Sequence, residues 1–231
     1  MSKKYERPES TMVDDAHAIT VSAMNSLGPV GAAGAELFGW LIEPPLRARK
    51  AKWMDDIAEG LRELERRADC VLDELKNKPE FIDAVCQASM AAIRTSQEEK
   101  LEALRNAVLN SALPNSPDEW ERTMFIHYVE SLSVWHLRLL RLMSAPLPWF
   151  QERGIKPPEF HIAGSLGAMV VKAMPELLGK SELIEQCIAD LQNRGLLSKF
   201  SYHTMMSQQG VYEKRGSEHG HAFLTYISAP K

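Results

Sequence analysis

The apolar residues between Lys52 and Leu75 repeat every seven positions, and this spacing constrains the fold more than any other feature. Two interleaved series place apolar side chains on one side of a helix, while Asp, Glu and Arg occupy the remaining positions. The first series is Ile57, Leu64 and Val71, and the second is Leu61, Ala68 and Leu75. Three heptads are short for an independent coiled coil, so the spacing favours one helix of a hairpin or bundle over a dimerising zipper.

Start and stop signals divide the next part of the chain into further helices. Residues 77–79 (NKP) end the first helix and open another. Residues 96–99 (SQEE) match a capping box, so the helix either breaks near Thr95 or runs straight on. Residues 116–119 (SPDE) combine a capping serine, a first-turn proline and a glutamate, and they open an aromatic helix. Residues 46–130 are therefore predicted to form a helical bundle.

The C-terminal part has a different order of elements. The spacing predicts a helix over 133–143, a proline-rich linker over 145–158, and two more helices over 162–174 and 181–195. Residues 200–206 then alternate between two faces, as in a strand, and a turn at 208–210 and a last helix from Ser217 follow. This order resembles a winged helix, with "HLRLLRLM" and "LIEQCIADLQNRGLL" as its first and third helices. The predicted fold is mainly α, with a bundle at 46–130 and a winged-helix-like domain with a small β-hairpin at 131–231.

Residues 1–45 form a Gly/Ala-rich apolar arm in which Glu36 and Glu43 are the only charges after Asp15. Small residues recur every fourth position, which lets another backbone approach closely, and basic residues follow the apolar run, as at a cytoplasmic membrane face. Pro44 and Pro45 are expected to end any helix at about Glu43. The arm can pack on the protein body, associate reversibly with a membrane, or span it. Its candidate residues are Gly31, Ala35, Gly39, Trp40, Arg47, Arg49 and Lys50.

Composition narrows the compartment and the partners. The net charge of −4 gives the whole chain no attraction for nucleic acid, so a DNA contact would need a local basic patch. The three cysteines lie far apart without a CxxC pair, which argues against a disulfide framework and a zinc site. Asp14 and Asp15 stand directly before the apolar stretch, which is unlike a signal peptide. The expected location is cytoplasmic, with peripheral contact to the inner membrane as an option.

The winged-helix-like part carries the candidate nucleic-acid or partner contacts. Its third helix is acidic to neutral on the exposed side, which repels phosphates. The predicted hairpin supplies a modest basic patch made of Lys199, His203, Lys214 and Arg215. A DNA-binding transcription regulator is therefore the alternative function, and a scaffold for packing or protein contact is the first interpretation of this domain.

No catalytic, cofactor or metal signature stands out. His219 and His221 lie two apart, so on a helix they point to different faces and chelate poorly. His136, beside Trp135, is interpreted as a structural histidine. Phosphate-loop, nucleophile-elbow and Cys-His patterns are missing. The chain is thus predicted to be no enzyme and to need no cofactor or metal.

The whole chain resembles a family of uncharacterised bacterial helical proteins. The resemblance rests on the Gly/Ala-rich start, the join at Pro44–Leu46, Arg49 and Trp53, the segment 98–114 and the "LSVWHL" helix at 132–137. In layout this is similar to the abortive-infection alpha family of phage-defence proteins, although the His-Pro pair that often precedes the aromatic helix there is absent. The resemblance implies a phage-defence or stress effector that acts through a protein partner or self-association.

Overall fold

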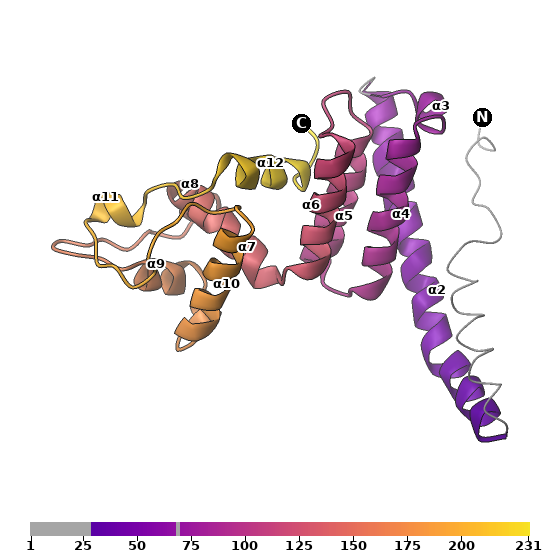
Figure 1. Ribbon diagram of the computed structural model, residues 1–231, viewed down its shortest axis with the longest axis horizontal. Coiled ribbons are helices and arrows are strands. Elements are labelled where there is room, and N and C mark those ends of the chain that lie inside the picture. Colours follow the sequence, from indigo (N-terminus) through magenta and orange to yellow (C-terminus); the bar gives the residue numbers. More distant parts are fainter. Residues whose placement is uncertain (1–28, 68–69) are drawn as a thin grey trace. The chain divides into compact units, whose positions relative to one another are not determined.

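The computed structural model describes residues 29–67 and 70–231, with side chains from Gly39 onward in these ranges (Figure 1). The described residues form α-helices and one 3-10 turn and no β-strand, which confirms the mainly α class. By its internal contacts the chain divides between Asp55 and Asp56 into two units. The second unit, residues 56–231, contains the helices from α3 onward.

Helix α2 (Pro29–Arg66) runs through Pro44 and Pro45, so the predicted helix end at Glu43 is wrong. A proline inside a helix removes one N–H donor and leaves the carbonyl four residues earlier without its partner. Here those carbonyls belong to Trp40 and Leu41, which are both exposed, as are the two prolines. Because this side of the helix faces solvent, water can satisfy the carbonyls and the helix tolerates the pair.

The heptad stripe is not one continuous helix. Helix α2 ends at Arg66, and α3 (Leu72–Leu75) begins after Val71, which is extended (φ −116, ψ 111) and exposed. Ile57, Leu64 and Leu75 are buried as predicted, whereas Ala68 lies outside the described residues. The apolar spacing therefore predicted which faces are buried at both ends of the segment, and it missed the break between them.

Three helices of residues 79–131 lie side by side in the predicted bundle: α4 (Pro79–Arg94), α5 (Glu98–Ser111) and α6 (Glu119–Ser131) (Figure 1). The chain breaks at Thr95, which settles the choice left open there. Helices α4 and α5 are in contact, and both bury small residues, namely Ala84, Ala88, Ala91, Ala92, Ala103 and Ala107. Asp118, and not Ser116, caps α6, because its Oδ1 accepts a hydrogen bond from the backbone N–H of Glu121 at 2.8 Å.

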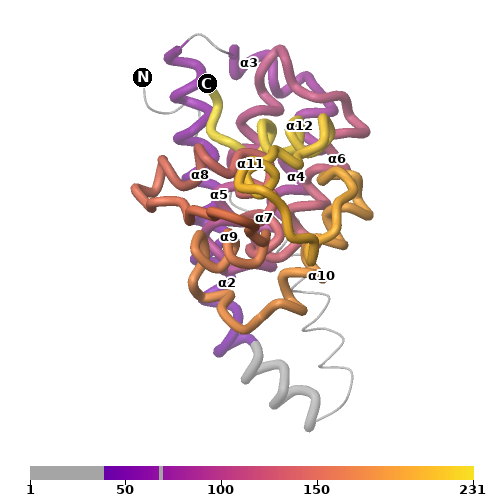
Figure 2. The backbone as a smooth tube through the Cα atoms, turned by 90° about the vertical axis from the view of Figure 1, so that its left-hand side faces the viewer, coloured from indigo at the N-terminus to yellow at the C-terminus, as the bar shows by residue number. Residues whose placement is uncertain are grey.

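Helix α7 (Val134–Ser144) is the central helix of the C-terminal part (Figure 2). It contacts α8 (Pro146–Glu152), α9 (Leu166–Ala173), α10 (Ser181–Asn193) and α12 (Glu218–Tyr226). A 3-10 turn (Pro175–Leu177) and the short α11 (Gln208–Val211) complete this part. Helix α8 occupies the predicted linker; its prolines fall in the first turn, where the helix needs no N–H donor.

The predicted β-hairpin is not formed. Within residues 196–216 the only antiparallel pairs are isolated bridges, Leu197 with Gly216 and, to another loop, Met206 with Gly164. Side chains take the backbone acceptors that a hairpin ladder would use. The amide of Gln192 donates to the carbonyls of Ser198 and Phe200, at 2.9 and 3.0 Å.

Helix α12 joins the C-terminal residues to α5, α6 and α7. Phe223 and Tyr226 of α12 lie beside Phe125 of α6, with ring centroids 5.5 and 5.6 Å apart. A Cβ on Gly220 would lie 2.1 Å from the carbonyl oxygen of Leu196, so only glycine permits this close approach. The predicted division into domains at residue 130 stays a prediction, while this ring cluster links helices from both sides of it.

Candidate functional site

The predicted arm residues all lie on α2, between Gly31 and Lys50. Gly31 and Ala35 are part of the helix, but their surroundings lie outside the described side chains. Trp40 is 75% exposed and Leu41 is 55% exposed, which is unusual for two large apolar neighbours. Gly39 is half-buried, and among the described side chains a Cβ there would meet the Glu43 carboxylate, at 3.7 Å.

The exposed positions of α2 between residues 40 and 52 share one face. Trp40, Pro44 and Arg47 follow one another at four and then three residues, so they lie along one side of the helix. Leu41, Pro45, Ala48 and Lys52 are also exposed and lie beside them. We call this set the Trp40 face. It is apolar at its N-terminal end and basic at its C-terminal end.

One basic residue of the Trp40 face has an acidic partner on the same helix. The guanidinium of Arg47 donates to the carboxylate of Glu43, one turn earlier. Arg49 and Lys50 are half-buried and lie next to the exposed face. Residues 39–52 contain four basic side chains and one acidic side chain, so this segment of the helix has a net positive charge. Within residues 29–67 and 70–231, no helix is both long enough and apolar enough to cross a bilayer.

The second predicted site is the loop between α10 and α12, and its four predicted residues differ in exposure and in their partners. Lys199 and Lys214 are exposed, as expected for contact residues. His203 is also exposed, but its Nε2 lies 3.1 Å from a carboxylate oxygen of Glu185 on α10. Glu182 and Glu185 are both exposed on α10. The basic patch is therefore smaller than predicted and lies next to acidic side chains.

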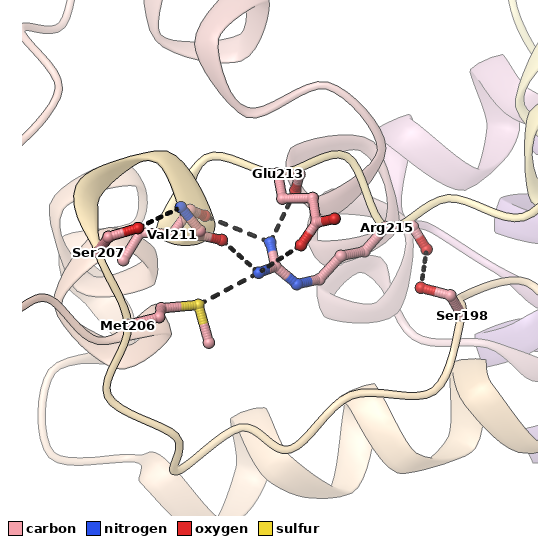
Figure 3. A network of polar contacts seen from close by, with 7 residues as sticks. Ser198, Met206, Ser207, Val211, Glu213 and Arg215 are labelled. Atoms are coloured by element: carbon pink, nitrogen blue, oxygen red, sulfur yellow. Dashed lines mark hydrogen bonds and ion pairs between the residues drawn. The ribbon is translucent and has the colours of Figure 1, made fainter.

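Arg215 is not a surface contact, because it is 4% exposed. Figure 3 shows its guanidinium pointing into the loop that α11 closes. Nη1 donates to the carbonyls of Glu213 (2.7 Å) and Val211 (3.3 Å), and Nη2 donates to the carbonyl of Gly210 and to Met206 Sδ (3.3 Å). Burial lowers the pKa of Arg215, and the Glu213 carboxylate opposes that shift. Arg215 therefore holds the loop together from inside.

A Ser–His–Asp arrangement lies at the start of α7, and sequence reasoning had named only its histidine, as a structural residue. Ser133 Oγ is 2.8 Å from His136 Nδ1, and His136 Nε2 is 3.3 Å from Asp190 Oδ2. The backbone N–H of Ser133 donates to Nδ1 at 3.2 Å, so in neutral His136 the proton is on Nε2 and is donated to Asp190. Asp190 is 54 residues away in sequence, and that separation gives no signal.

This arrangement is better explained by structure than by catalysis. Contact between Ser133 and His136 is local, and it places a side-chain acceptor on the backbone N–H at the helix start, as a capping box does. The neighbouring thiol of Cys187 lies 3.8 Å from Nδ1. Burial, together with the Asp190 charge, raises its pKa to about 11, so this thiol stays protonated at neutral pH. The interpretation of His136 as a structural histidine agrees with these contacts.

The surroundings of His136 predict a pH-dependent stability. Burial lowers its pKa below the ordinary 6.5, and the Asp190 carboxylate only partly offsets this. The unfolded chain then binds more protons than the folded chain below about pH 6.5, so stability is full above that pH and falls as pH decreases. We expect His136→Gln to flatten this dependence between about pH 7.5 and 5.5 in urea unfolding. An unchanged slope, equal to that of the exposed-site control His203→Gln, would contradict the prediction.

The His219–Gly220–His221 segment is divided between two environments. The ring of His219 packs on Phe125 and Tyr128, with centroids 5.2 and 5.9 Å apart. Nδ1 of His221 instead contacts the carbonyl of Ser217 at 2.7 Å. In the part of the chain that the structure describes, no group of three or more metal-ligating side chains occurs.

Comparison of the chain with family models, curated proteins and solved structures finds no match.

Proposed function

We propose that the protein is a non-enzymatic interaction protein that docks on an anionic membrane surface through the Trp40 face of α2. The observation that carries this proposal is the 75% exposure of Trp40 on the side of the helix that also holds Arg47. An indole suits the boundary between headgroups and acyl chains, because its ring is apolar and its N–H remains able to donate.

The basic end of the face supplies the second attraction. Basic residues near an anionic leaflet contribute about 1 kcal/mol each, and this contribution falls with added salt. One apolar group alone gives only marginal membrane binding. The exposed indole and the basic residues together provide the two attractions that a reversible peripheral anchor needs. Such a helix lies in the plane of the surface, which agrees with the failure of the described helices to meet the length and hydropathy of a span.

In the cell we propose a role as a bacterial phage-defence or stress effector, peripheral to the inner membrane and working through a protein partner or self-association. The support is the similarity in layout to the abortive-infection alpha family together with the exposed face on α2. Docking of the Trp40 face on the membrane, or its release from the membrane, would then change which partner the protein binds.

A winged-helix regulator remains the second candidate. The order of α7, α9 and α10 and the return of the chain at the Leu197–Gly216 bridge favour it, as do the exposed Lys199 and Lys214. Exposed Glu182 and Glu185 on α10 and the inward position of Arg215 weigh against it. Salt-sensitive DNA retardation that disappears in Lys199→Gln/Lys214→Gln would favour this candidate over membrane docking.

Co-sedimentation of the full chain with vesicles tests the proposal. We expect binding to vesicles of phosphatidylcholine and phosphatidylglycerol, weaker binding as salt rises, and little binding to phosphatidylcholine alone. Trp40→Ala should weaken binding about tenfold, because burying a large apolar side chain is worth about 1.5–3 kcal/mol. Arg47→Gln/Lys52→Gln should weaken binding and reduce its salt dependence.

Trp120→Ala is the matched control, because Trp120 is 68% exposed and belongs to α6, not to α2. It should bind vesicles as the unmodified chain does. Equal loss in Trp40→Ala and Trp120→Ala, or binding that ignores lipid charge, would overturn the membrane proposal. A chain that stays in the supernatant with vesicles but self-associates through Trp40 would assign the face to a protein contact instead.

A further inference from the structure

Helix α4 carries a stripe of apolar residues on the side opposite its buried residues. The helix contacts α5 and α6. Its buried residues are Phe81, Ala84, Ala88, Ala91 and Ala92. At 3.6 residues per turn, the other side of the helix holds apolar residues at spacings of three and four. They are Pro79, Ile82, Cys86, Met90 and Ile93, and we call this set the α4 stripe.

The middle of the α4 stripe is open to solvent. Ile82 is 42% exposed and Met90 is 55% exposed, while Cys86 between them is half-buried. Single exposed apolar residues are common on protein surfaces and need no explanation. An apolar stripe that continues over three turns of one helix instead indicates a contact surface.

The α4 stripe is self-complementary about Cys86. Ile82 and Met90 each lie four residues from Cys86, so each is roughly 6 Å from it along the helix axis. When a second copy packs its α4 in the antiparallel direction with Cys86 opposite Cys86, each Ile82 faces Met90 of the other copy. A two-fold symmetric dimer requires this kind of match, in which residue i contacts residue j and j contacts i.

The charges beside the stripe select the antiparallel direction. Asp83 and Arg94 are exposed and lie on the same flank, about 60° and 80° around the helix from Cys86. In an antiparallel two-fold pair this flank is on the same side in both copies. The Arg94 end of one helix therefore lies beside Asp83 and the exposed Glu80 of the other. A parallel pair would instead place residues of equal charge at the same height.

Arg94 can take part in such a contact and keep its partner within the chain. Its Nη1 donates to Oε1 of Glu130 on α6 at 2.7 Å, and the Arg94 side chain is 66% exposed. A guanidinium has five N–H donors in one plane, so it can bind a second carboxylate beside the first. The contact with Glu130 thus holds a positive charge at the C-terminal end of the stripe.

We propose that the α4 stripe docks on the α4 stripe of a second copy of this chain, in an antiparallel two-fold dimer with Cys86 near the axis. The proposal rests on the proposed function only where that function includes self-association, and it is independent of membrane docking by α2. One helix pair provides less area than a standard interface, so we expect a dissociation constant on the order of 10 μM.

Sedimentation velocity of the full chain without lipid tests the proposal. The mass should rise from one chain to two over concentrations that bracket the expected dissociation constant. Met90→Glu should weaken the dimer about tenfold or more, because it buries a charge against Ile82 of the second copy. Leu147→Glu is the matched control, since Leu147 is 51% exposed on α8, and it should dimerise as the unmodified chain does. Far-UV circular dichroism of both variants should be unchanged.

A charge exchange tests the direction of the pair. Asp83→Lys should weaken the dimer about threefold to fivefold, because it places like charges together across the interface. Adding Arg94→Glu should restore most of the affinity. Residues 83 and 94 are roughly 16 Å apart along their own helix, so the recovery requires a second copy.

Cross-linking locates the axis. Packed helices lie about 8–10 Å apart, so a short bismaleimide should link two copies through Cys86, and Cys86→Ser should abolish the link. A chain that stays monomeric, or a dimer that survives Met90→Glu, would overturn the proposal. A dimer lost in Trp40→Ala but kept in Met90→Glu would also overturn it and assign self-association to the Trp40 face. A chain that ignores vesicles but dimerises through Met90 would overturn membrane docking alone.

Discussion

Phe125→Ala is expected to lower the free energy of unfolding by about 3–5 kcal/mol, which is the usual cost of removing a fully buried aromatic ring. Phe125 has no exposed surface, and it packs on Tyr128 of its own helix and on His219, Phe223 and Tyr226 of α12. Removing the ring leaves a cavity where α6 and α12 meet. Urea unfolding at neutral pH measures the loss.

The location of the damage distinguishes this effect from a general loss of stability. Because α12 contributes three of the four ring partners, its amide protons should lose protection from hydrogen exchange more than those of α4. Trp120→Ala on the same helix is the matched control, since Trp120 is exposed and a surface change of this kind costs about 0.5 kcal/mol or less. Comparable losses in the two variants would contradict the proposed importance of the ring cluster.

Most helices could be predicted from local chemistry. Pro79 at the start of α4, the glycine after α10 and the serine before α12 are signals that act within a few residues, and the structure places helix ends at each of them. Apolar spacing was equally informative for α7, where Leu137, Leu140 and Met143 have no exposed surface. These features need no knowledge of distant residues.

The errors have a common cause, which is that distant or solvent partners decided the local structure. Pro44 and Pro45 did not end α2, because the carbonyls they leave unpaired face water. The alternating residues after Phe200 did not form a strand: the Phe200 carbonyl accepts from the side chain of Gln192, and Met206 pairs with Gly164 of another loop. Neither outcome is visible in the spacing of the residues concerned.

The candidate site residues also divide into those that local sequence could identify and those that depend on distant partners. Trp40 and Arg47 could be named from an apolar stretch with a basic edge, and both side chains are exposed. The contact between His136 and Asp190 could not, because the two residues are 54 positions apart in sequence and only the fold brings them together. Arg215 was misassigned for the opposite reason: charge suggests the surface, yet backbone carbonyls of its own loop draw it inside.

Arg215→Ala is the second change with a large expected effect, about 3 kcal/mol or more in the free energy of unfolding. It removes the donor that the carbonyls of Gly210, Val211 and Glu213 share. The Gly210 carbonyl still accepts from the backbone N–H of Glu213, whereas a buried acceptor left unsatisfied costs about 1–3 kcal/mol. Arg215→Lys should recover only part of the loss, because one ammonium cannot reproduce the two nitrogens that now donate to carbonyls and to Met206 Sδ. Urea unfolding of both variants measures these differences.

Lys214→Ala is the matched control, since the neighbouring side chain is exposed and its removal should change stability by about 0.5 kcal/mol or less. Limited proteolysis adds a local measurement: without Arg215 the segment 199–214 loses its internal donor and should be cleaved first. If Arg215→Ala unfolds like Lys214→Ala, Arg215 does not hold the loop and is again a candidate contact residue. If the loop opens while α7 and α10 stay folded, Arg215 fixes the positions of Lys199 and Lys214 on the surface. Arg215 is then no contact residue itself, but it determines where the two exposed lysines can make contacts.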